Sequence, residues 1–219
     1  MEYKQANIPD FQKSYFNRKI DIQDEVILDS NGYADDIMME WEREIMRDAA
    51  AIVSHNQGDV LNVGFGMGIV DSYIEEHKPK THWIIEGHPD VQRKMIADGW
   101  LQKPHVRCIF KPWQEVIYHL PKFDGIYFDT WDDDQSDFDA NAHNILKKGG
   151  RFCFFNNPDQ SPRYRVEPDF YILERHSDII SQNLDITFQH QRIETDIPEG
   201  LDYWASTTKD YHHPICTKK

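Results

Sequence analysis

The sequence predicts an α/β fold in which an open, mostly parallel β-sheet carries helices on both faces. Short apolar runs of strand type alternate with helical patterns between residues 59 and 155. The first run leads directly into three glycines at alternate positions, and a helical pattern follows them. Two later runs close on a carboxylate, at Glu86 and at Asp129. Ligands gather outside the carboxyl ends of the strands in such a sheet, so a functional site is expected there.

Five strands are expected in the alternating region, each a short apolar run. They span residues 60–63, 82–86, 106–110, 123–130 and 151–155. Helical patterns join them, and the last of these is expected to end at the pair Gly149–Gly150, because glycine commonly terminates helices. One more helix at 169–182 and two or three late strands, near 185–193, 203–207 and 211–216, complete the prediction.

The beginning of the chain is harder to interpret. Residues 1–36 mix aromatic and charged side chains without a clear period, so we expect an N-terminal extension that packs on the domain or covers its ligand. Residues 37–219 form the single predicted domain. From 38 to 53 the apolar residues recur at helical spacing, which puts Met38, Glu42 and Met46 on one stripe. That stripe is also compatible with an ordinary half-buried helix surface.

Bulk properties narrow the possible functions. The chain has 219 residues and a formal net charge of −14, which repels a phosphate backbone and disfavours nucleic acid as a partner. No apolar run is long enough to span a membrane and no secretory signal is visible, so a cytoplasmic protein is expected. The three cysteines, Cys108, Cys153 and Cys216, have no paired spacing and are interpreted as reduced core thiols.

The glycine turn predicts a nucleotide cofactor in a Rossmann-like sheet. Glycine lacks a Cβ, so a ligand can lie against the backbone of such a turn. Glu86 follows about 20 residues later, where an acidic side chain accepts hydrogen bonds from ribose hydroxyls. The G-x-G-x-G spacing differs from the G-x-G-x-x-G turn that cradles a pyrophosphate, which favours S-adenosylmethionine. A nicotinamide-dependent oxidoreductase remains the alternative enzyme class.

Four motifs in order carry a resemblance to a known family: residues 38–46, 62–68, 82–86 and 123–130. They resemble guanidinoacetate N-methyltransferase, and more closely the fungal and plant arginine N-methyltransferase 2, which modifies the internal δ nitrogen of arginine. Residues 98–100 (Asp-Gly-Trp) and the late pair His213-Pro214 are shared with that second group. The resemblance implies a class I S-adenosylmethionine-dependent methyltransferase with a seven-stranded, mostly parallel sheet.

The resemblance also implies a role for individual side chains. Those expected to bind the cofactor are Met38 and Met46 from the preceding helix, the turn residues Gly64, Phe65, Gly66, Met67 and Gly68, Glu86 at the ribose, Pro112 and Trp113 at the adenine, and Asp129. Those expected to bind the substrate are Glu42, Asp129, Thr130 and Trp131.

Two carboxylates suit the chemistry of a guanidinium. This cation keeps its proton at neutral pH, with a pKa near 13.8, and binds a carboxylate through two parallel hydrogen bonds. Glu42 and Asp129 would fix its plane and aim one nitrogen at the methyl donor. We favour Asp129 as base and Glu42 as orienting partner, with the reverse assignment open. Guanidino methylation needs no Lewis acid, so no metal is expected, and the eleven histidines show no metal-type spacing.

Several points of substrate choice stay open at this stage. The acidic residues 132–134 depart from the guanidinoacetate enzyme and are interpreted either as facing a second positive charge or as a solvated loop. Asn156, Arg163 and, with it, Arg165 are candidates for binding an amino-acid carboxylate. Arginine, free or as a small derivative, is the first expected substrate, guanidinoacetate the second and protein arginine a third. A non-catalytic cofactor-binding module is the rival of another class, and a homodimer is one option for the assembly.

Overall fold

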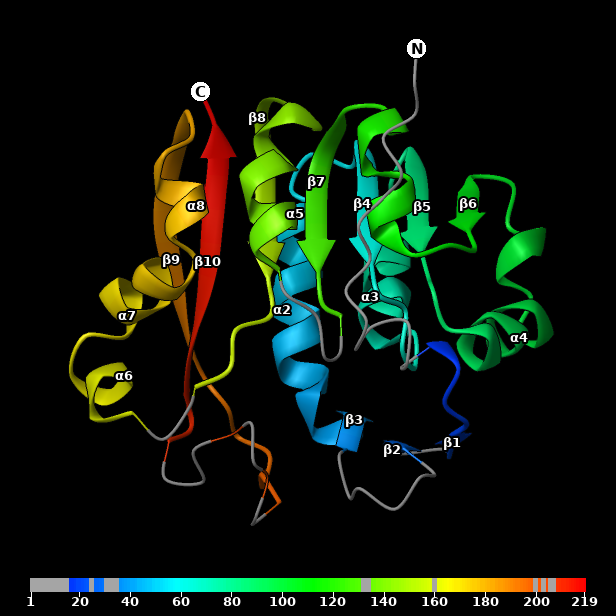
Figure 1. Ribbon diagram of the computed structural model, residues 1–219, viewed down its shortest axis with the longest axis horizontal. Coiled ribbons are helices and arrows are strands. Elements are labelled where there is room, and N and C mark those ends of the chain that lie inside the picture. Colours follow the sequence, from blue (N-terminus) through cyan, green and yellow to red (C-terminus); the bar gives the residue numbers. More distant parts are fainter. Residues whose placement is uncertain are drawn as a thin grey trace.

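The computed structural model describes residues 16–23, 26–29, 36–130, 135–158, 161–198, 201, 204 and 208–219. Within these ranges the main sheet has seven strands in the order β6-β5-β4-β7-β8-β10-β9 (Figure 1). The strands are β4 Asp59–Val63, β5 Thr81–Ile85, β6 Val106–Ile109, β7 Phe123–Phe128, β8 Leu146–Phe154, β9 Leu184–Arg192 and β10 Asp210–Lys218. The first five in this order are parallel, whereas β10 is antiparallel to both of its neighbours. The predicted α/β class is confirmed.

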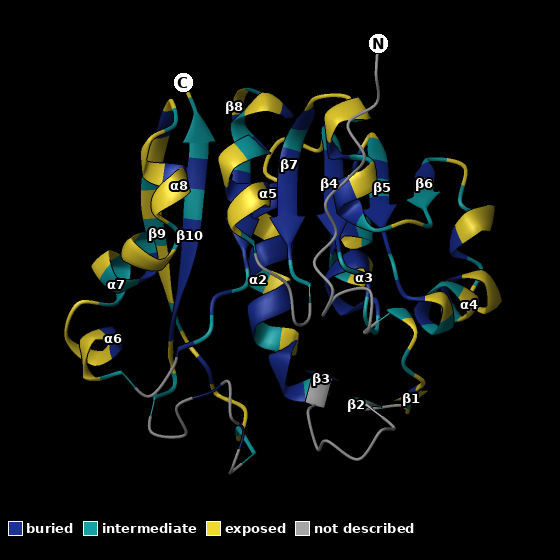
Figure 2. Ribbon diagram, viewed as in Figure 1, coloured by how far each residue is buried: buried dark blue, intermediate teal, exposed yellow. Residues whose placement is uncertain are grey.

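Helices cover both faces of this sheet because the side chains of its strands alternate between two cores. The helices are α2 Arg43–Val53, α3 Ile69–Glu76, α4 Pro89–Ala97, α5 Ser136–Asn141, α6 Pro162–Val166, α7 Pro168–Arg175 and α8 Ser177–Ile180. Short 3-10 turns are η1 Glu40–Glu42, η2 Trp100–Gln102, η3 Trp113–Glu115, η4 Ile117–His119 and η5 Ala142–Asn144. On β4, Val60 packs with α2, α3 and α4, whereas Leu61 and Val63 pack with η3, α5, α7 and α8. Figure 2 shows β4 and β7 buried between these layers.

The N-terminal region contains a small sheet that the sequence did not reveal. Three short antiparallel strands, β1 Ile20–Ile22, β2 Val26–Asp29 and β3 Asp36–Met39, lie in the order β1-β2-β3. The helix expected from residue 38 therefore begins later, at Arg43 after η1. Met38 is paired with Ile27 in β3, so the predicted stripe of Met38, Glu42 and Met46 on one helix is wrong.

Two helix boundaries also differ from the prediction. Gly149 and Gly150 lie inside β8 instead of ending a helix, and a Cβ on Gly150 would lie 2.9 Å from the carbonyl oxygens of Lys147 and Phe123. Gly150 therefore serves close packing where the register between β7 and β8 shifts, whereas Gly149 adopts a positive φ of 75° with open space around it. The helix expected at 169–182 is divided into α7 and α8 at His176, whose backbone leaves the helical region with φ −112° and ψ 45°.

The late strands predicted near 185–193 and 211–216 are present in the structure. The one predicted near 203–207 is not seen at Trp204, the residue of that range that the structure describes. Trp204 is not in a strand and instead packs against Trp41 and Tyr211, with ring centroids 4.8 and 5.9 Å away. Residues 203 and 205–207 lie outside the described residues.

The structure also bears on the expected thiols and on membrane spans. The three cysteines are free, with Cys153 and Cys216 buried, as expected for core thiols. Burial raises the pKa of Cys108 to about 11, so its thiol stays protonated at neutral pH.

Among the described helices, none has the length and hydropathy that crossing a bilayer requires.

Candidate functional site

The glycine turn is formed where three parallel strands end. Gly64, Gly66 and Gly68 have φ of 94°, 54° and 77°, in the left-handed region that favours glycine. The backbone N–H of Gly64 donates to Ile85 O (2.9 Å) and that of Asp129 donates to Val63 O (2.9 Å). A Cβ on Gly64 would lie 1.8 Å from the carbonyl oxygen of Asp129. The ends of β4, β5 and β7 are therefore in direct contact at this turn.

A buried network of polar side chains holds the glycine turn in place. Asn62 donates through Nδ2 to the carbonyl oxygen of Gly64 and to Asp71 Oδ2, both at 2.8 Å. His82 bridges Asp71 and Glu75 through its two ring nitrogens, at 3.0 and 2.9 Å. Burial opposes the charged ring, but the hydrogen bonds to both carboxylates raise the pKa of His82. The network ties the glycine turn to α3 and β5.

Glu86 lies at the edge of the turn and is only 7% exposed. One carboxylate oxygen accepts the backbone N–H of Phe65 (3.0 Å) and the other accepts that of His88 (2.6 Å). Burial raises the pKa of Glu86, although these backbone donors work in the opposite direction. A carboxylate offers about four acceptor positions, so further donors can still approach it. The predicted role of Glu86 at a ribose is compatible with this placement and stays a prediction.

The two methionines assigned to the cofactor lie in different surroundings. Met38 contacts the turn from strand β3: its sulfur accepts the backbone N–H of Met67 at 3.1 Å, and a Cβ on Gly66 would come within 2.6 Å of it. Met46 is fully buried on α2, where its sulfur accepts the Tyr127 hydroxyl at 3.4 Å. Of these two methionines, Met38 is the one whose contacts reach the glycine turn, whereas those of Met46 reach Tyr127.

Pro112 and Trp113 follow β6 and begin η3. The indole of Trp113 is 5% exposed and lies edge-on against Phe128 and Phe138, with centroids 5.8 and 5.3 Å away. Its ring is thus part of the core beneath β7. A contact with an adenine at this position stays a prediction.

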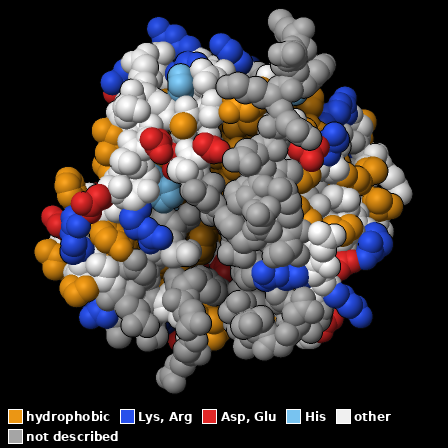
Figure 3. Space-filling view, in the orientation of Figure 1, with side chains coloured by type: hydrophobic (Ala, Val, Ile, Leu, Met, Phe, Trp, Pro, Cys, Tyr) orange, Lys and Arg blue, Asp and Glu red, His pale blue; other side chains and the backbone are white. Residues whose placement is uncertain are grey.

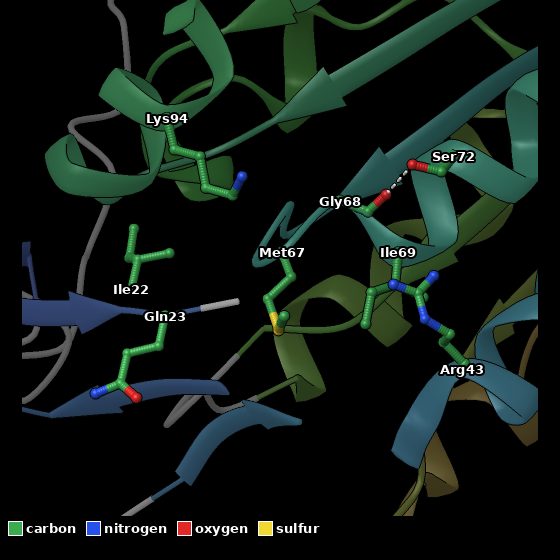
Figure 4. Close-up of a pocket in the computed structure, with 8 residues that line it drawn as sticks. All are labelled: Ile22, Gln23, Arg43, Met67, Gly68, Ile69, Ser72 and Lys94. Atoms are coloured by element: carbon green, nitrogen blue, oxygen red, sulfur yellow. Dashed lines mark hydrogen bonds between the residues drawn. The ribbon is translucent and has the colours of Figure 1, made fainter. Parts of the chain in front are cut away.

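A cavity of about 420 Å³ lies beside the turn, at the start of α3 (Figure 4). Its lining residues are Ile22, Gln23, Arg43, Met67, Gly68, Ile69, Ser72 and Lys94. Ser72 Oγ donates to the carbonyl oxygen of Gly68 at 2.7 Å, which closes the first turn of the helix. Ile22 and Gln23 belong to the N-terminal extension, so this part of it borders the glycine turn; a covering role for residues 1–36 stays a prediction.

A second cavity, of about 280 Å³, lies where β7 and β8 end. It is lined by Asp129, Thr130, Gln135, Ser136, Asp139, Phe155, Asn156, Asn157, Arg175 and His176. Three of the predicted substrate residues, Asp129, Thr130 and Asn156, are thus brought together. Trp131 and residues 132–134 lie outside the described residues.

The carboxylate of Asp129 is the most perturbed acid of this cavity. Burial raises its pKa to about 7, and no other cause contributes among the described residues. Glu42 is 4% exposed on η1 and does not line the cavity. Both carboxylates nevertheless act on the hydroxyl of Tyr127, whose pKa is raised mainly by burial, then by the charge of Asp129, and less by several other groups that include Glu42. Glu42 and Asp129 are therefore within electrostatic reach of the same buried atom.

Asn156 presents an unused acceptor. Its backbone N–H and its Nδ2 donate to the Tyr211 hydroxyl at 3.0 and 3.2 Å, and Nδ2 also donates to the carbonyl oxygen of His212 at 2.9 Å. Its Oδ1 is buried and accepts no hydrogen bond within the described ranges. A buried acceptor without a donor is costly, so this oxygen is suited to a ligand that donates an N–H or O–H.

An aspartate–histidine pair on the wall of the cavity escaped the sequence analysis. Asp139 is 1% exposed and pairs with His176 Nδ1 at 2.7 Å, and it also accepts a hydrogen bond from Gln135 Nε2 at 2.7 Å. Burial raises the pKa of Asp139, and the bond to His176 opposes this shift. His176 is also the residue that separates α7 from α8. No local motif indicates the pair, since its members are 37 residues apart.

The arginine at the cavity is Arg175, at the end of α7, and not the predicted Arg163. Arg163 lies on α6 and forms ion pairs with Glu174 at 2.5 Å and Glu167 at 3.5 Å. Figure 3 shows acidic and basic side chains interspersed on this face of the molecule. A carboxylate-binding role for Arg163 stays a prediction that the cavity lining does not support.

Comparison with known proteins identifies related sequences. A family model described as guanidinoacetate N-methyltransferase matches residues 18–158. The protein arginine N-methyltransferase 2 of Yarrowia lipolytica is 34% identical over 207 residues, covering 84% of this chain and 42% of the relative. That of Saccharomyces cerevisiae is 30% identical over 224 residues, covering 94% of this chain and 53% of the relative. The chain thus spans about half the length of these relatives.

Solved structures agree on the fold. Spermidine synthase from Thermotoga maritima superimposes with a TM-score of 0.61 at 15% identity, covering 93% of this chain and 74% of that one. Aeropyrum pernix fibrillarin, solved with S-adenosyl-L-methionine, gives a TM-score of 0.54 at 13% identity and covers 91% of this chain and 98% of that one. The fold is that of the S-adenosylmethionine-dependent methyltransferases, and the chain belongs to the guanidinoacetate N-methyltransferase family.

Proposed function

We propose that this chain is an S-adenosylmethionine-dependent N-methyltransferase that acts on a guanidino nitrogen, with arginine, free or as a small derivative, as its first substrate. The observation that carries the proposal is the set of acceptors at the 280 Å³ cavity. The Asp129 carboxylate and the unused Asn156 Oδ1 can both accept hydrogen bonds from a ligand there. The guanidinium of arginine offers five N–H donors and no acceptor, which matches such a cavity.

The residues at the glycine turn fit the proposed cofactor. Backbone with positive φ at Gly64 and Gly66 lies at the carboxyl edge of the sheet, where ligands of this fold bind. The buried carboxylate of Glu86 keeps acceptor positions for ribose hydroxyls. When bound, S-adenosylmethionine supplies an electrophilic methyl group on its sulfonium. The fit supports the cofactor that the family and the fold suggest.

In the proposed mechanism the chain orients the acceptor and takes up its proton. The ionised Asp129 carboxylate binds two parallel N–H groups of the guanidinium, and Asn156 Oδ1 accepts a further one. Glu42 supplies a second negative charge within electrostatic reach of the Tyr127 hydroxyl. As the attacking nitrogen becomes more acidic, its proton passes to a carboxylate oxygen of Asp129. A positioned base of this kind contributes about 10²–10⁴-fold to the rate.

The raised pKa favours Asp129 over Glu42 as the base. A general base is most effective when its pKa lies near the operating pH, and burial brings that of Asp129 to about 7. Glu42 then serves mainly to orient the cation, as the sequence analysis proposed. Both carboxylates also compensate the positive charge of the substrate in a partly desolvated site.

Arginine is preferred over guanidinoacetate for two reasons. The two relatives named above are named as arginine methyltransferases. The cavity also contains Arg175, whose guanidinium can pair with the α-carboxylate of a free amino acid. Protein arginine and guanidinoacetate are the alternatives, and methylation of the internal δ nitrogen is the form proposed for arginine.

The test is to mix the protein with methyl-labelled S-adenosylmethionine and, in separate reactions, L-arginine, guanidinoacetate and an arginyl peptide. Label in arginine is expected, and fragmentation by mass spectrometry then identifies the methylated nitrogen. If none of the three substrates became labelled, the proposal that the methyl acceptor is a guanidino group would be refuted. If calorimetry then showed cofactor binding without turnover, the non-catalytic module would replace our proposal, and binding of a nicotinamide cofactor instead would point to an oxidoreductase.

A further inference from the structure

Three side chains of types that bind metals meet at the β9–β10 edge of the main sheet, and none of them lines either cavity. They are Asp169 on α7, His190 on β9 and His212 on β10. One ligand atom from each lies within 4.8 Å of the others. Asp169 Oδ1 is 2.6 Å from His212 Nδ1, and Asp169 Oδ2 is 3.5 Å from His190 Nε2.

The backbone accounts for this convergence. His190 and His212 are directly opposite each other in the antiparallel pair β9–β10, so their side chains project from the same face. Their rings are close, with centroids 4.1 Å apart. Helix α7 packs against β10 and brings Asp169, in its first turn, to the same place. The ligands come from three elements, so their spacing in the sequence gives no sign of a metal site.

We propose that Asp169, His190 and His212 bind a divalent transition-metal ion, with Zn²⁺ as the best fit. Zinc takes imidazole nitrogens and carboxylate oxygens at about 2.0–2.2 Å, which separates tetrahedral ligand atoms by roughly 3.3 Å. The contacts of 2.6 and 3.5 Å lie on either side of that value, and all three ligand atoms lie within 4.8 Å of one another, so side-chain rotation would have to adjust these distances around an ion. Three protein ligands leave a fourth position for water, a common arrangement at zinc.

The exposure of the three side chains also suits an ion that arrives from solvent. The side chain of His212 is 11% exposed, that of Asp169 43% and that of His190 63%. His212 is therefore fixed in place, whereas His190 is free to adjust its ring. With neutral imidazoles the site carries the single negative charge of Asp169, which attracts a dication. An ion pair between Arg192 and Asp210 lies next along the same two strands and leaves the local charge balanced.

A bound ion would link α7 to the edge strand β9. Helix α7 holds Asp169 in its first turn and Arg175 at its end, where Arg175 lines the 280 Å³ cavity. The metal would therefore stabilise the element that presents Arg175. This role is structural, and binding of the metal can be measured without methyl transfer.

The experiment is a calorimetric titration of chelator-treated protein with Zn²⁺, followed by Co²⁺ as a spectroscopic probe. One equivalent is expected to bind, with a visible Co²⁺ absorption typical of tetrahedral coordination. His190→Ala removes an exposed ligand without disturbing the core and is expected to weaken binding at least ~10-fold. Asp169→Asn should also weaken Zn²⁺ binding.

The matched control is His119→Ala, since His119 is an exposed histidine on η4 and outside the cluster. It should bind Zn²⁺ like the unmodified protein. Absence of binding, or binding that persists unchanged in both His190→Ala and Asp169→Asn, would overturn the proposal. In that case the cluster is a hydrogen-bonded pair of Asp169 and His212 with a neighbouring histidine ring.

Discussion

Gly64 lies against the backbone of Asp129, so closely that a Cβ on Gly64 would be 1.8 Å from the Asp129 carbonyl oxygen. The contact joins the turn proposed to hold the cofactor to the strand end proposed to hold the substrate. Two residues that are far apart in the sequence thus have their backbones fixed against each other. The distance between donor and acceptor groups in the site is therefore sensitive to the size of residue 64.

Gly64→Ala is expected to reduce both stability and cofactor binding. The left-handed backbone alone costs roughly 1–2 kcal/mol for a residue with a Cβ, and displacement of the Asp129 backbone adds to this. Gly149→Ala is the matched control, because Gly149 has φ 75° but nothing within 4 Å of its Cβ position. Urea unfolding and calorimetry measure the two effects. Equal losses in both variants would show that the contact with Asp129 is unimportant.

The pH dependence of the reaction should report Asp129. Its pKa is raised to about 7, so the carboxylate ionises as pH rises through that value, and kcat/KM for arginine should rise with it and then level off. The substrate guanidinium stays protonated throughout, with a pKa near 13.8, and cannot cause this rise. Asp129→Asn should lower kcat by about 10²-fold or more while cofactor binding persists. A profile without an inflection near 7 would remove Asp129 as the base.

His82→Ala should destabilise the fold strongly. It leaves Asp71 fully buried with the neutral Asn62 amide as its one hydrogen-bonding side chain among the described residues, and breaking a buried ion pair in this way costs about 3–5 kcal/mol. His105→Ala is the control: its ring also contacts Glu75 but its side chain is 36% exposed, so a loss of about 1 kcal/mol or less is expected. Chemical denaturation measures both. Similar losses would argue against a charged His82–Asp71 pair.

The same network predicts how the stabilisation varies with pH. The pKa of His82 is raised above its ordinary 6.5, so its contribution is complete below 6.5 and is lost as pH rises through the raised value. That of Glu75 is lowered from 4.5 to about 2, so its contribution is complete above 4.5 and is lost as pH falls towards 2. The difference in unfolding free energy between the unmodified protein and His82→Ala should be largest between these two ordinary values, 4.5 and 6.5. A difference that grows above pH 8 would contradict a charged ring.

Arg175→Gln tests how the substrate carboxylate is bound. Its KM for L-arginine should rise about tenfold, the equivalent of one charge-assisted hydrogen bond. Agmatine has the same guanidinium without the carboxylate and should be unaffected by the change. Arg163→Gln is the control, because Arg163 pairs with Glu174 away from the cavity. If Arg163→Gln alone weakened arginine binding, the original assignment to Arg163 would be restored.

The sequence predicted the sheet and the strand ends that meet at one of its edges well, because apolar alternation and strand-end acids are local signals. Asp129, Thr130 and Asn156 share a cavity since they follow two neighbouring parallel strands, which topology alone implies. Met38 was placed on a helix because its apolar spacing to residues 41 and 45 fits a helix, whereas its pairing with Ile27 depends on contacts that spacing does not record.

The remaining parts of the site depend on long-range packing. Asp139 and His176 meet only because α5 packs beside α8, and neither residue belongs to a motif. Arg175 reaches the cavity from the end of α7, and the continuous helix predicted over 169–182 gives no sign that a helix ends there. Local sequence patterns identify the strand ends. The side chains that neighbouring helices bring to the cavity can be identified only from the three-dimensional structure.

The position of β10 between β8 and β9 has a consequence for synthesis of the chain. When the ribosome has completed β9, the strand that will separate it from β8 does not yet exist. Until residues 210–218 emerge, the β8 edge is bare and β9 has no neighbour to bond with in this sheet. Unpaired edges of this kind recruit other chains, so nascent copies arrested before residue 210 should aggregate or engage chaperones.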